Sequence, residues 1–459
     1  MRGEFPLTPE SAGPLDVTAM LRSRAFVVLL VLAAVVGLVA SLAAWGFLEL
    51  VYQVQQGVWD KLPDWVGYDD GAPLWWAVPV LAIAGAVVAV AIVRLPGEGG
   101  HVPAEGLKTG VTQPIELPGV LLAAVAGIGL GVVLGPEAPL IALGGGVGVL
   151  VLRRVRKDAP EELTAVMAAA GTFAALAMIF ESPVIASVVV IEAAGLGGPR
   201  LPVVLVPGLL AAGIGSLLLV GMGSWTGLDT GNIAIGILDL PNFARPDVAD
   251  VGWTILLAVA TAVVAFVVIR IAREAHPRFM VRPFLFLPLA GIAVAGLAIA
   301  FAETTDKGVD QVLFSGQNAV GPLVSDASSW SLTALALLIA FKGIAWSISL
   351  GAFRGGPVFP SLFLGAAAGL MAAQLPGFSI TPAVTVGMGA AVASVLRLPL
   401  SAVVLAILLS SQSGPGAAPL VIVGVVVAYV TTQMLSRYQS DDGGGRVAPV
   451  DHGDHVLST

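Results

Sequence analysis

The sequence predicts an all-α polytopic membrane protein with two inverted-topology repeats, whose broken helices meet at mid-membrane. Three observations predict this fold: an apolar composition, recurring apolar stretches, and two motif pairs in the same order. Of the 459 residues 57% are hydrophobic and 11% charged, with a mean hydropathy of +0.94. A soluble domain does not keep so much apolar surface covered. Stretches near the roughly 20 residues needed to cross a bilayer occur at 25–50, 76–93, 118–134, 202–221, 252–271, 284–302, 330–350 and 417–435.

The chain is expected to form one transmembrane domain between two short tails. The first apolar stretch, from Phe26 to about Leu50, is longer than the roughly 7–15 apolar residues of a cleavable signal peptide and should remain as a helix. We place the domain at 22–438, with repeat halves at about 25–221 and 250–435. The polar segments 1–21 and 439–459 are expected to be cytoplasmic tails without a regulatory domain.

Basic residues predict the orientation in a cell membrane. Lys and Arg gather in some loops, whereas the segments 60–70, 239–250 and 303–310 are rich in acids. Because cytoplasmic loops carry the excess of positive charge, both termini are expected inside. The net charge of −8 argues against a nucleic-acid partner. The basic positions are Arg22, Arg24, Arg94, Lys108, Arg153, Arg154, Arg156, Lys157, Arg270, Arg273, Arg278, Arg282, Arg437 and Arg446.

Two motif pairs indicate the internal repeat. The segment 139–144, followed by a glycine-rich turn, matches the segment 360–365, and Pro183 and Pro399 each open a later apolar run. Such repeats commonly place a substrate between them on broken helices. Chance is the alternative, because proline and glycine are common in membrane helices.

The sequence offers no metal site and no enzymatic machinery. It has no cysteine and four scattered histidines, so it lacks the ligand spacing of a metal cluster. It also has no nucleophile–base arrangement, phosphate loop or cofactor motif. We expect neither enzymatic activity nor a cofactor.

Each repeat is expected to start a helix inside the bilayer. The segments 135–139 and 355–360 each combine glycine and proline within an apolar stretch, which suits a helix start. The free N–H groups and partial positive charge there favour an anion; a packing kink is the alternative. Glu137 is the more specific signal. A carboxylate inside the membrane has a large desolvation cost and is usually functional unless it is paired. The alternative is that Glu137 pairs with a buried lysine such as Lys342. Beside an anion site, its charge would compete for the same N–H donors, so we interpret Glu137 as a gate.

These motifs resemble those of the CLC chloride channels and transporters. The segment 129–148 is similar to the family's gating-glutamate segment, 99–107 to its Gly-Ser-Gly-Ile-Pro motif, and 355–365 to its Gly-Gly-Ile-Phe-x-Pro motif. The segments at 180–192 and 398–400 resemble later proline-opened helices, and the resemblance covers about residues 25–435. It implies a homodimer in the lipid membrane with one anion pathway per subunit. The residues expected along this pathway are Gly99, Gly100, His101, Val102, Ala138, Pro139, Gly356, Val358 and Phe359.

Several positions depart from the family pattern. Gly100 stands where the resemblance implies an anion-contacting serine, and His101 replaces a glycine. Pro136 replaces a basic residue, and Pro357 an apolar one. Since proline has no N–H, both prolines delete a potential backbone ligand. The anion site is therefore expected to differ from the usual one.

Proton coupling is expected to be weak or absent in its usual form. The resemblance places Ala193 at the family's inner proton glutamate, with Glu192 just before it, and Glu192 is the alternative proton carrier. Tyr438 is the candidate for the inner gate, with an interfacial aromatic as the alternative. Arg354, just before Gly355, is a candidate to attract anions, with a lipid or loop contact as the alternative.

The predicted function is transport of chloride or a similar small anion through a Glu137-gated pathway, channel-like or weakly proton-coupled. One alternative is a proton/chloride exchanger that uses Glu137 and Glu192. Another is a secondary transporter of a different solute with Glu137 and Lys342 as binding groups. A membrane scaffold without transport is the third.

Overall fold

The computed structural model describes residues 21–107, 109–198, 201–226 and 236–442. These residues contain helices and no strand, apart from one isolated antiparallel bridge between Gly135 and Gly356. In the first part of the chain the helices are α2 (Arg24–Gln56), α3 (Leu62–Trp65), α4 (Ala77–Arg94), α5 (Leu117–Gly129), α6 (Glu137–Val155), α7 (Glu161–Ile179), α8 (Pro183–Ala193) and α9 (Leu201–Thr226).

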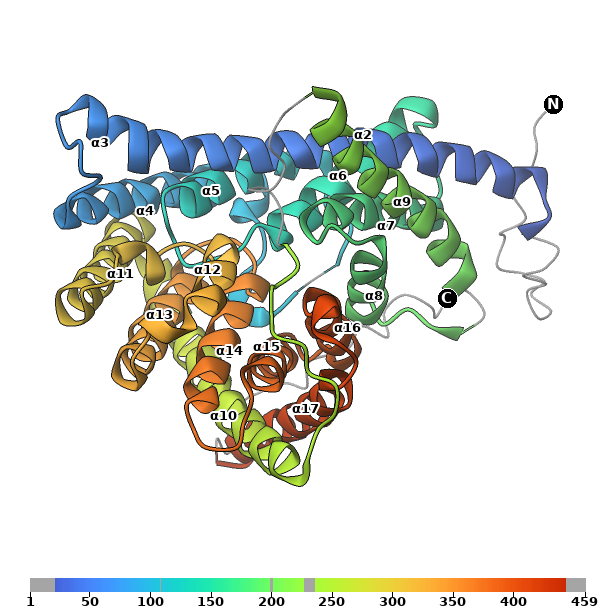
Figure 1. Cartoon of the computed structure of the whole chain (residues 1–459). Helices are drawn as coiled ribbons and strands as arrows, with labels where there is room; N and C mark the ends of the chain where they lie inside the picture. The colour runs from blue at the N-terminus through green and yellow to red at the C-terminus, as the bar shows by residue number, and fades with distance from the viewer. Residues whose placement is uncertain (1–20, 108, 199–200, 227–235, 443–459) are drawn as a thin grey trace.

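The second part of the chain supplies the rest of the bundle. Its helices are α10 (Val248–Val281), α11 (Pro283–Thr305), α12 (Val320–Ser325), α13 (Leu332–Ala352), α14 (Val358–Ala373), α15 (Ile380–Leu396), α16 (Pro399–Leu409) and α17 (Ala417–Asp442). In Figure 1 the long α2 crosses the first set of helices, and α10 to α17 gather on the other side of that set.

Nine helices of the described segments are long and apolar enough to cross a membrane. Shorter apolar helices, among them α5, α8, α14 and α16, lie between them. The stretch 118–134 was expected near spanning length, but its helix α5 ends at Gly129 and the chain then turns toward Glu137. Long helices combined with short, broken ones confirm a multi-pass membrane fold.

The internal repeat is visible as two equivalent sets, α6–α9 and α14–α17. Within each set the first two helices cross so closely that glycine faces backbone, Gly144 against Gly171 and Gly365 against Gly387. A Cβ atom at any of these four glycines would collide with the carbonyl group of its partner glycine. Small residues therefore allow close helix packing at Gly144, and the same arrangement recurs in the second set.

The second and third helices of each set are separated by a matching break. Glu181 and Arg397 adopt positive φ angles of 50° and 58°, and Pro183 and Pro399 then open α8 and α16. A left-handed residue ends a helix, and proline suits the first turn of the next. The two halves thus share both their close helix crossings and their breaks.

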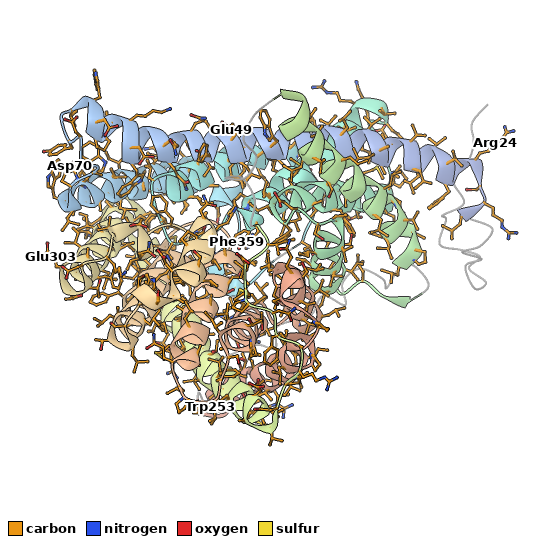
Figure 2. The ribbon with its side chains drawn as sticks, viewed as in Figure 1. Arg24, Glu49, Asp70, Trp253, Glu303 and Phe359 are labelled. Atoms are coloured by element: carbon orange, nitrogen blue, oxygen red, sulfur yellow. The ribbon has the colours of Figure 1, made fainter. Side chains whose placement is uncertain are left out.

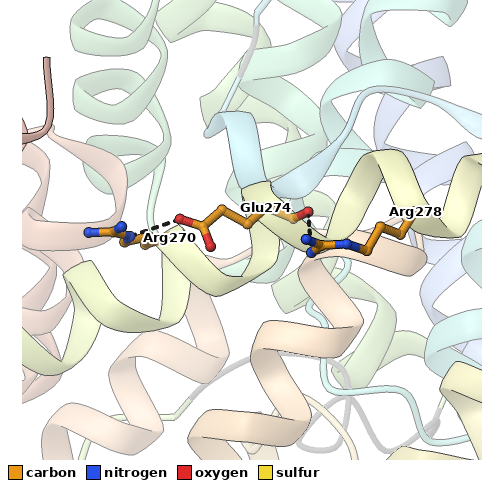
Figure 3. Close-up of polar contacts among 3 residues, drawn as sticks. All are labelled: Arg270, Glu274 and Arg278. Atoms are coloured by element: carbon orange, nitrogen blue, oxygen red, sulfur yellow. Dashed lines mark hydrogen bonds and ion pairs between the residues drawn. The ribbon is translucent and has the colours of Figure 1, made fainter. Parts of the chain in front are cut away.

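The ends of the bundle separate charge. In Figure 2 Asp70 and Glu303 lie at one end of the molecule, whereas Arg24 lies at the far end of α2. On α10, Arg270 Nε lies 2.8 Å from Glu274 Oε1, and Arg278 Nη1 donates to the Glu274 carbonyl at 3.0 Å (Figure 3). These exposed groups hold the end of α10 in polar surroundings, as expected where a helix leaves the bilayer.

Two helix ends differ from the expected bounds. α2 extends to Gln56, beyond the predicted end near Leu50, and continues through a π-helical turn at Gly57–Lys61 into α3. α17 continues to Asp442, past the expected start of the tail at 439. Polar residues continue both helices, so apolar periodicity alone did not mark their ends.

Candidate functional site

The two predicted helix starts lie side by side. Gly135 N–H donates to the Gly356 carbonyl at 2.8 Å, and Gly356 N–H donates to the Gly135 carbonyl at 2.6 Å. α6 begins two residues after Gly135 and α14 two residues after Gly356. Since Gly135 and Gly356 are equivalent in the repeat, each half contributes the same position to one reciprocal contact.

Proline and glycine explain why the helices begin here. Pro136 and Pro357 precede the first helical residues with φ angles of −85° and −93°. A Cβ atom at Gly135 or Gly356 would collide with the carboxylate of Glu137, and one at Gly355 would lie 2.7 Å from the Cβ atom of Leu134. Glycine is therefore required by close approach of the two segments and by the space that Glu137 fills.

Glu137 is the first residue of α6 and is 1% exposed. Its Oε1 atom accepts a hydrogen bond from the backbone N–H of Val358, the first residue of α14. Its Oε2 atom has no hydrogen-bond partner among the described residues. The carboxylate therefore occupies a donor at a helix N-terminus, where an anion is favoured.

Two cavities approach this carboxylate from different sides. One, of about 620 Å³, has Pro136 in its wall together with the acids Asp60 and Asp310. The other, of about 460 Å³, has Ala138 and Pro139 in its wall. Because residues on either side of Glu137 line different cavities, the buried Glu137 lies at the partition between them.

The 460 Å³ cavity gathers most of the predicted pathway residues. Gly99, Gly100 and His101 line it together with Ala138 and Pro139, whereas Val102 does not. Gly99 and Gly100 have φ angles of 73° and 101°, which place the loop in a conformation that favours glycine. The motif at 99–101 is thus brought to the start of α6, as its place in the predicted pathway requires.

The remaining pathway residues lie at the partition. Gly356 forms the bridge, and Val358 donates to Glu137. The Phe359 ring is fully buried, with its centroid 5.9 Å from that of Phe180; Figure 2 places Phe359 in the middle of the bundle. The aromatic next to the Val358 position therefore packs in the core beside the break before α8.

Arg354 holds the glycine loop against this site. It is 4% exposed and lines the 460 Å³ cavity. Its Nε atom donates to the carbonyls of Gly100 at 3.1 Å and Glu98 at 3.3 Å, and its Nη1 atom to the Phe353 carbonyl at 3.2 Å. The predicted loop contact is present, and the same side chain also reaches the cavity.

Glu192 lies at another helix start. Its carboxylate accepts from the backbone N–H groups of Leu400 at 2.9 Å and Ser401 at 2.6 Å, and from Ser401 Oγ at 2.6 Å. The C-terminal end of α8 is thereby fastened to the first turn of α16. The structure does not bring Glu192 to either cavity described above. The backbone of Tyr438 belongs to α17, and its side chain lies outside the described residues.

Lys342 does not pair with Glu137, contrary to the alternative considered from the sequence. Its fully buried ammonium group donates to four backbone carbonyls at 3.0 to 3.3 Å and lies 4.5 Å from the centroid of the Phe363 ring. The acceptors are Gln311, Val312, Leu313 and Phe314. These contacts use the three ammonium hydrogens, so Lys342 stabilises the segment 311–314 by hydrogen bonding.

Sequence reasoning missed the residues that form the other cavity. Gln55 and Gln56 line it from the end of α2 and Trp59 from the π-helical turn that follows, and the segment around Ser315–Asn318 completes the wall. The polar pair Gln55–Gln56, at the end of an otherwise apolar helix, was the available signal.

Comparison with known proteins identifies the family. The model of the voltage gated chloride channel family matches residues 105–433. The chain belongs to this family. The resemblance noted in the sequence is therefore confirmed for most of the chain, although the matched range begins after the glycine loop at 99–101.

Relatives and solved structures agree with this membership. The Escherichia coli protein YfeO, provisionally named an ion-transport protein, is 30% identical over 368 residues, which cover 76% of this chain and 80% of YfeO. A slow cyanobacterial Cl⁻/H⁺ antiporter superposes with a TM-score of 0.71 at 20% identity, over 89% of this chain and 94% of its own. A CLC-type fluoride/proton antiporter gives 0.64 at 18% identity, over 89% and 96%. These structures confirm the predicted CLC-like fold.

Proposed function

We propose that this protein moves chloride or a similar small inorganic anion across the membrane, and that Glu137 is the gate. The observation that carries the proposal is the position of the Glu137 carboxylate, which occupies the N–H of Val358 at the partition between two cavities. Membership of the voltage gated chloride channel family supports an anion as the solute.

The gate works by competition for one donor. While the carboxylate is ionised, it takes the N–H group at the start of α14 and repels an approaching anion. Protonation removes its charge, weakens that hydrogen bond and lets the side chain leave. An anion then meets the partial positive charge at two helix N-termini, which hold it weakly enough to release it.

We propose that transport is channel-like or only weakly coupled to protons. Ala193 offers no titratable group, and all the contacts of Glu192 described above serve the first turn of α16. An exchanger that uses Glu137 and Glu192 is the alternative, and it requires Glu192 to leave three hydrogen bonds. A transporter of another solute would need Lys342 as a binding group, but its ammonium is occupied by carbonyls.

We also propose the setting in which transport occurs. The acidic 620 Å³ cavity faces outward and the 460 Å³ cavity faces the cytoplasm, with both termini inside, because the basic loops accompany the latter side of the chain. The resemblance to CLC proteins supports a homodimer with one pathway in each subunit. We propose one transmembrane domain at 22–438, with the tails outside it.

The deciding experiment is anion efflux from liposomes that contain the purified protein, with external pH recorded. Wild type should release chloride, and Glu137→Ala should release it faster because the competing carboxylate is gone. Proton movement coupled to chloride would favour the exchanger. If neither protein releases chloride, fluoride or nitrate, transport of small anions is excluded.

A further inference from the structure

Arg354 carries a buried positive charge beside the proposed anion path. It follows the end of α13 directly after Phe353 and precedes the glycine pair at the start of α14. Its side chain is 4% exposed and lines the 460 Å³ cavity together with Gly100, Ala138 and Pro139. A full charge therefore lies in the wall of the cavity that ends at Glu137.

Arg354 forms no direct ion pair with a carboxylate of the described residues, although Glu98 and Glu105 act on its charge from a greater distance. Nε and Nη1 donate to three backbone carbonyls, whereas Nη2 forms no hydrogen bond with the described residues. No carboxylate of the described segments lies within ion-pair distance of the guanidinium. Glu98 and Glu116 line the same cavity, but Glu98 meets Arg354 through its carbonyl. A buried guanidinium whose direct contacts are all backbone carbonyls favours a counter-ion at close range.

Only the second half of the repeat carries this charge. Counting back from the paired glycines Gly135 and Gly356, the counterpart of Arg354 is Val133, which is fully buried and apolar. Gly100, whose carbonyl accepts from Arg354, has no side-chain hydroxyl, and Pro357 has no N–H. The charge can therefore replace contacts that these residues cannot make.

We propose that Arg354 forms an anion-binding subsite of the 460 Å³ cavity, in which Nη2 holds a small monovalent anion before it reaches the Glu137 partition. This inference rests on the proposed function. The three carbonyl contacts fix the guanidinium plane and leave one edge for the ligand, and arginine keeps its charge when buried. Arg354 thus recruits the anion by charge, and the helix N-termini beyond it bind by dipoles alone.

Concentration dependence tests the subsite in proteoliposomes. Arg354→Gln should raise the half-saturating chloride concentration by about tenfold or more, because a unit charge a few ångströms from the anion is lost. Arg354→Lys, compared with wild type at pH 6 so that the buried lysine stays protonated, keeps the charge and should stay within about threefold of wild type. Arg273→Gln is the matched control: Arg273 donates to the Ala104 carbonyl at 2.9 Å near the same loop but lies outside the cavity wall.

The outcomes separate the subsite from a purely structural role. If Arg354→Lys is impaired as severely as Arg354→Gln, Arg354 acts by fastening the glycine loop and the subsite is wrong. Equal half-saturation in wild type and Arg354→Gln also overturns it, while leaving anion transport intact. Absence of flux in wild type would instead reject the proposed function.

A direct measurement needs no variant. Crystals of wild-type protein grown in bromide should show anomalous density within hydrogen-bond distance of Arg354 Nη2. Bromide elsewhere in the pathway but absent at Arg354 would overturn the subsite. Bromide at Arg354 in a protein without flux would support the subsite and count against transport.

Discussion

Glu137 accepts a hydrogen bond from the backbone N–H of Val358, its own counterpart in the second repeat. The repeat thus supplies two equivalent helix starts, which differ at their first helical residue: one carries a carboxylate and the other an apolar side chain. The carboxylate of Glu137 on α6 therefore binds the first residue of α14, which has no carboxylate at the equivalent position. Under the proposed function, this arrangement lets one residue control a site built from both halves.

The first prediction concerns pH. Wild-type efflux should rise as pH falls, because protonation of Glu137 removes the negative charge that holds the Val358 N–H. Glu137→Gln is neutral at every pH and should show flat efflux, about tenfold or more above wild type at neutral pH, since a hydrogen bond to a charged group is worth about 1.5–3 kcal/mol. Both expectations are tested by measuring efflux from liposomes between pH 5 and 8, because most other side chains do not change protonation in that range.

A matched control for this prediction is Glu49→Gln. Glu49 lies in α2, accepts from Gln53 Nε2 at 2.7 Å and lines neither cavity. Its loss should leave the pH profile unchanged. A wild-type profile that is itself flat, or that falls with acid, would contradict the competition at Val358.

The second prediction concerns Lys342. Lys342→Met should lower the free energy of unfolding by about 3 kcal/mol or more, because it removes a charged donor and leaves buried carbonyls without a partner. Thermal unfolding in detergent measures this. Lys307→Met is the control, since Lys307 is only partly buried and its ammonium contacts are Ser329 Oγ at 3.3 Å and the Trp330 ring at 4.7 Å. Similar melting of the two variants would show that the four carbonyl contacts contribute little.

The third prediction concerns the close helix crossings. Gly387→Ala should destabilise the protein by about 1–3 kcal/mol, because the new methyl group meets the Gly365 carbonyl and lies 3.1 Å from Gly369 N. Gly46→Ala in α2 has nothing within 4 Å of the new methyl and should stabilise by up to about 1 kcal/mol. The two substitutions are expected to change stability in opposite directions. Equal changes would show that contact with the Gly365 backbone is not what requires glycine at position 387.

The fourth prediction concerns Glu192. Glu192→Ala should cost about 1–2 kcal/mol, the range for loss of a helix N-cap, since two backbone N–H groups of α16 lose their acceptor. Ser401→Ala removes only the hydroxyl contact and should cost less. Both variants should leave the external pH trace during chloride efflux as in wild type. A pH trace altered by Glu192→Ala alone would return Glu192 to a proton path.

Local backbone chemistry was readable from the sequence. Glycine permits φ angles and close approaches that other residues disfavour, whereas proline fixes φ and has no N–H. The helix starts at Glu137 and Val358 therefore followed from the composition at those positions. Glycine-rich segments follow both helix starts. Repetition of both signals in the same order predicted two similar halves, because equivalent segments obey the same local rules.

Partners distant in the chain could not be predicted in this way. Lys342 seemed able to pair with Glu137, but its neighbours are carbonyls of a segment about 30 residues earlier that only the tertiary fold brings near. Glu192 caps a helix 208 residues away. A buried charge in the sequence indicates that a partner is present, but only the tertiary fold shows which residue it is.

The partition between the two cavities is also where we expect the membrane voltage to act. A unit charge that crosses the whole membrane exchanges roughly 2.3 kcal/mol per 100 mV. Where water enters from both faces, most of this potential falls across the remaining low-dielectric layer, here the layer around Glu137. A short swing of one carboxylate through that layer then moves charge through a large share of the field. We therefore expect the electrical state of the membrane to bias the gate without any separate sensor helix.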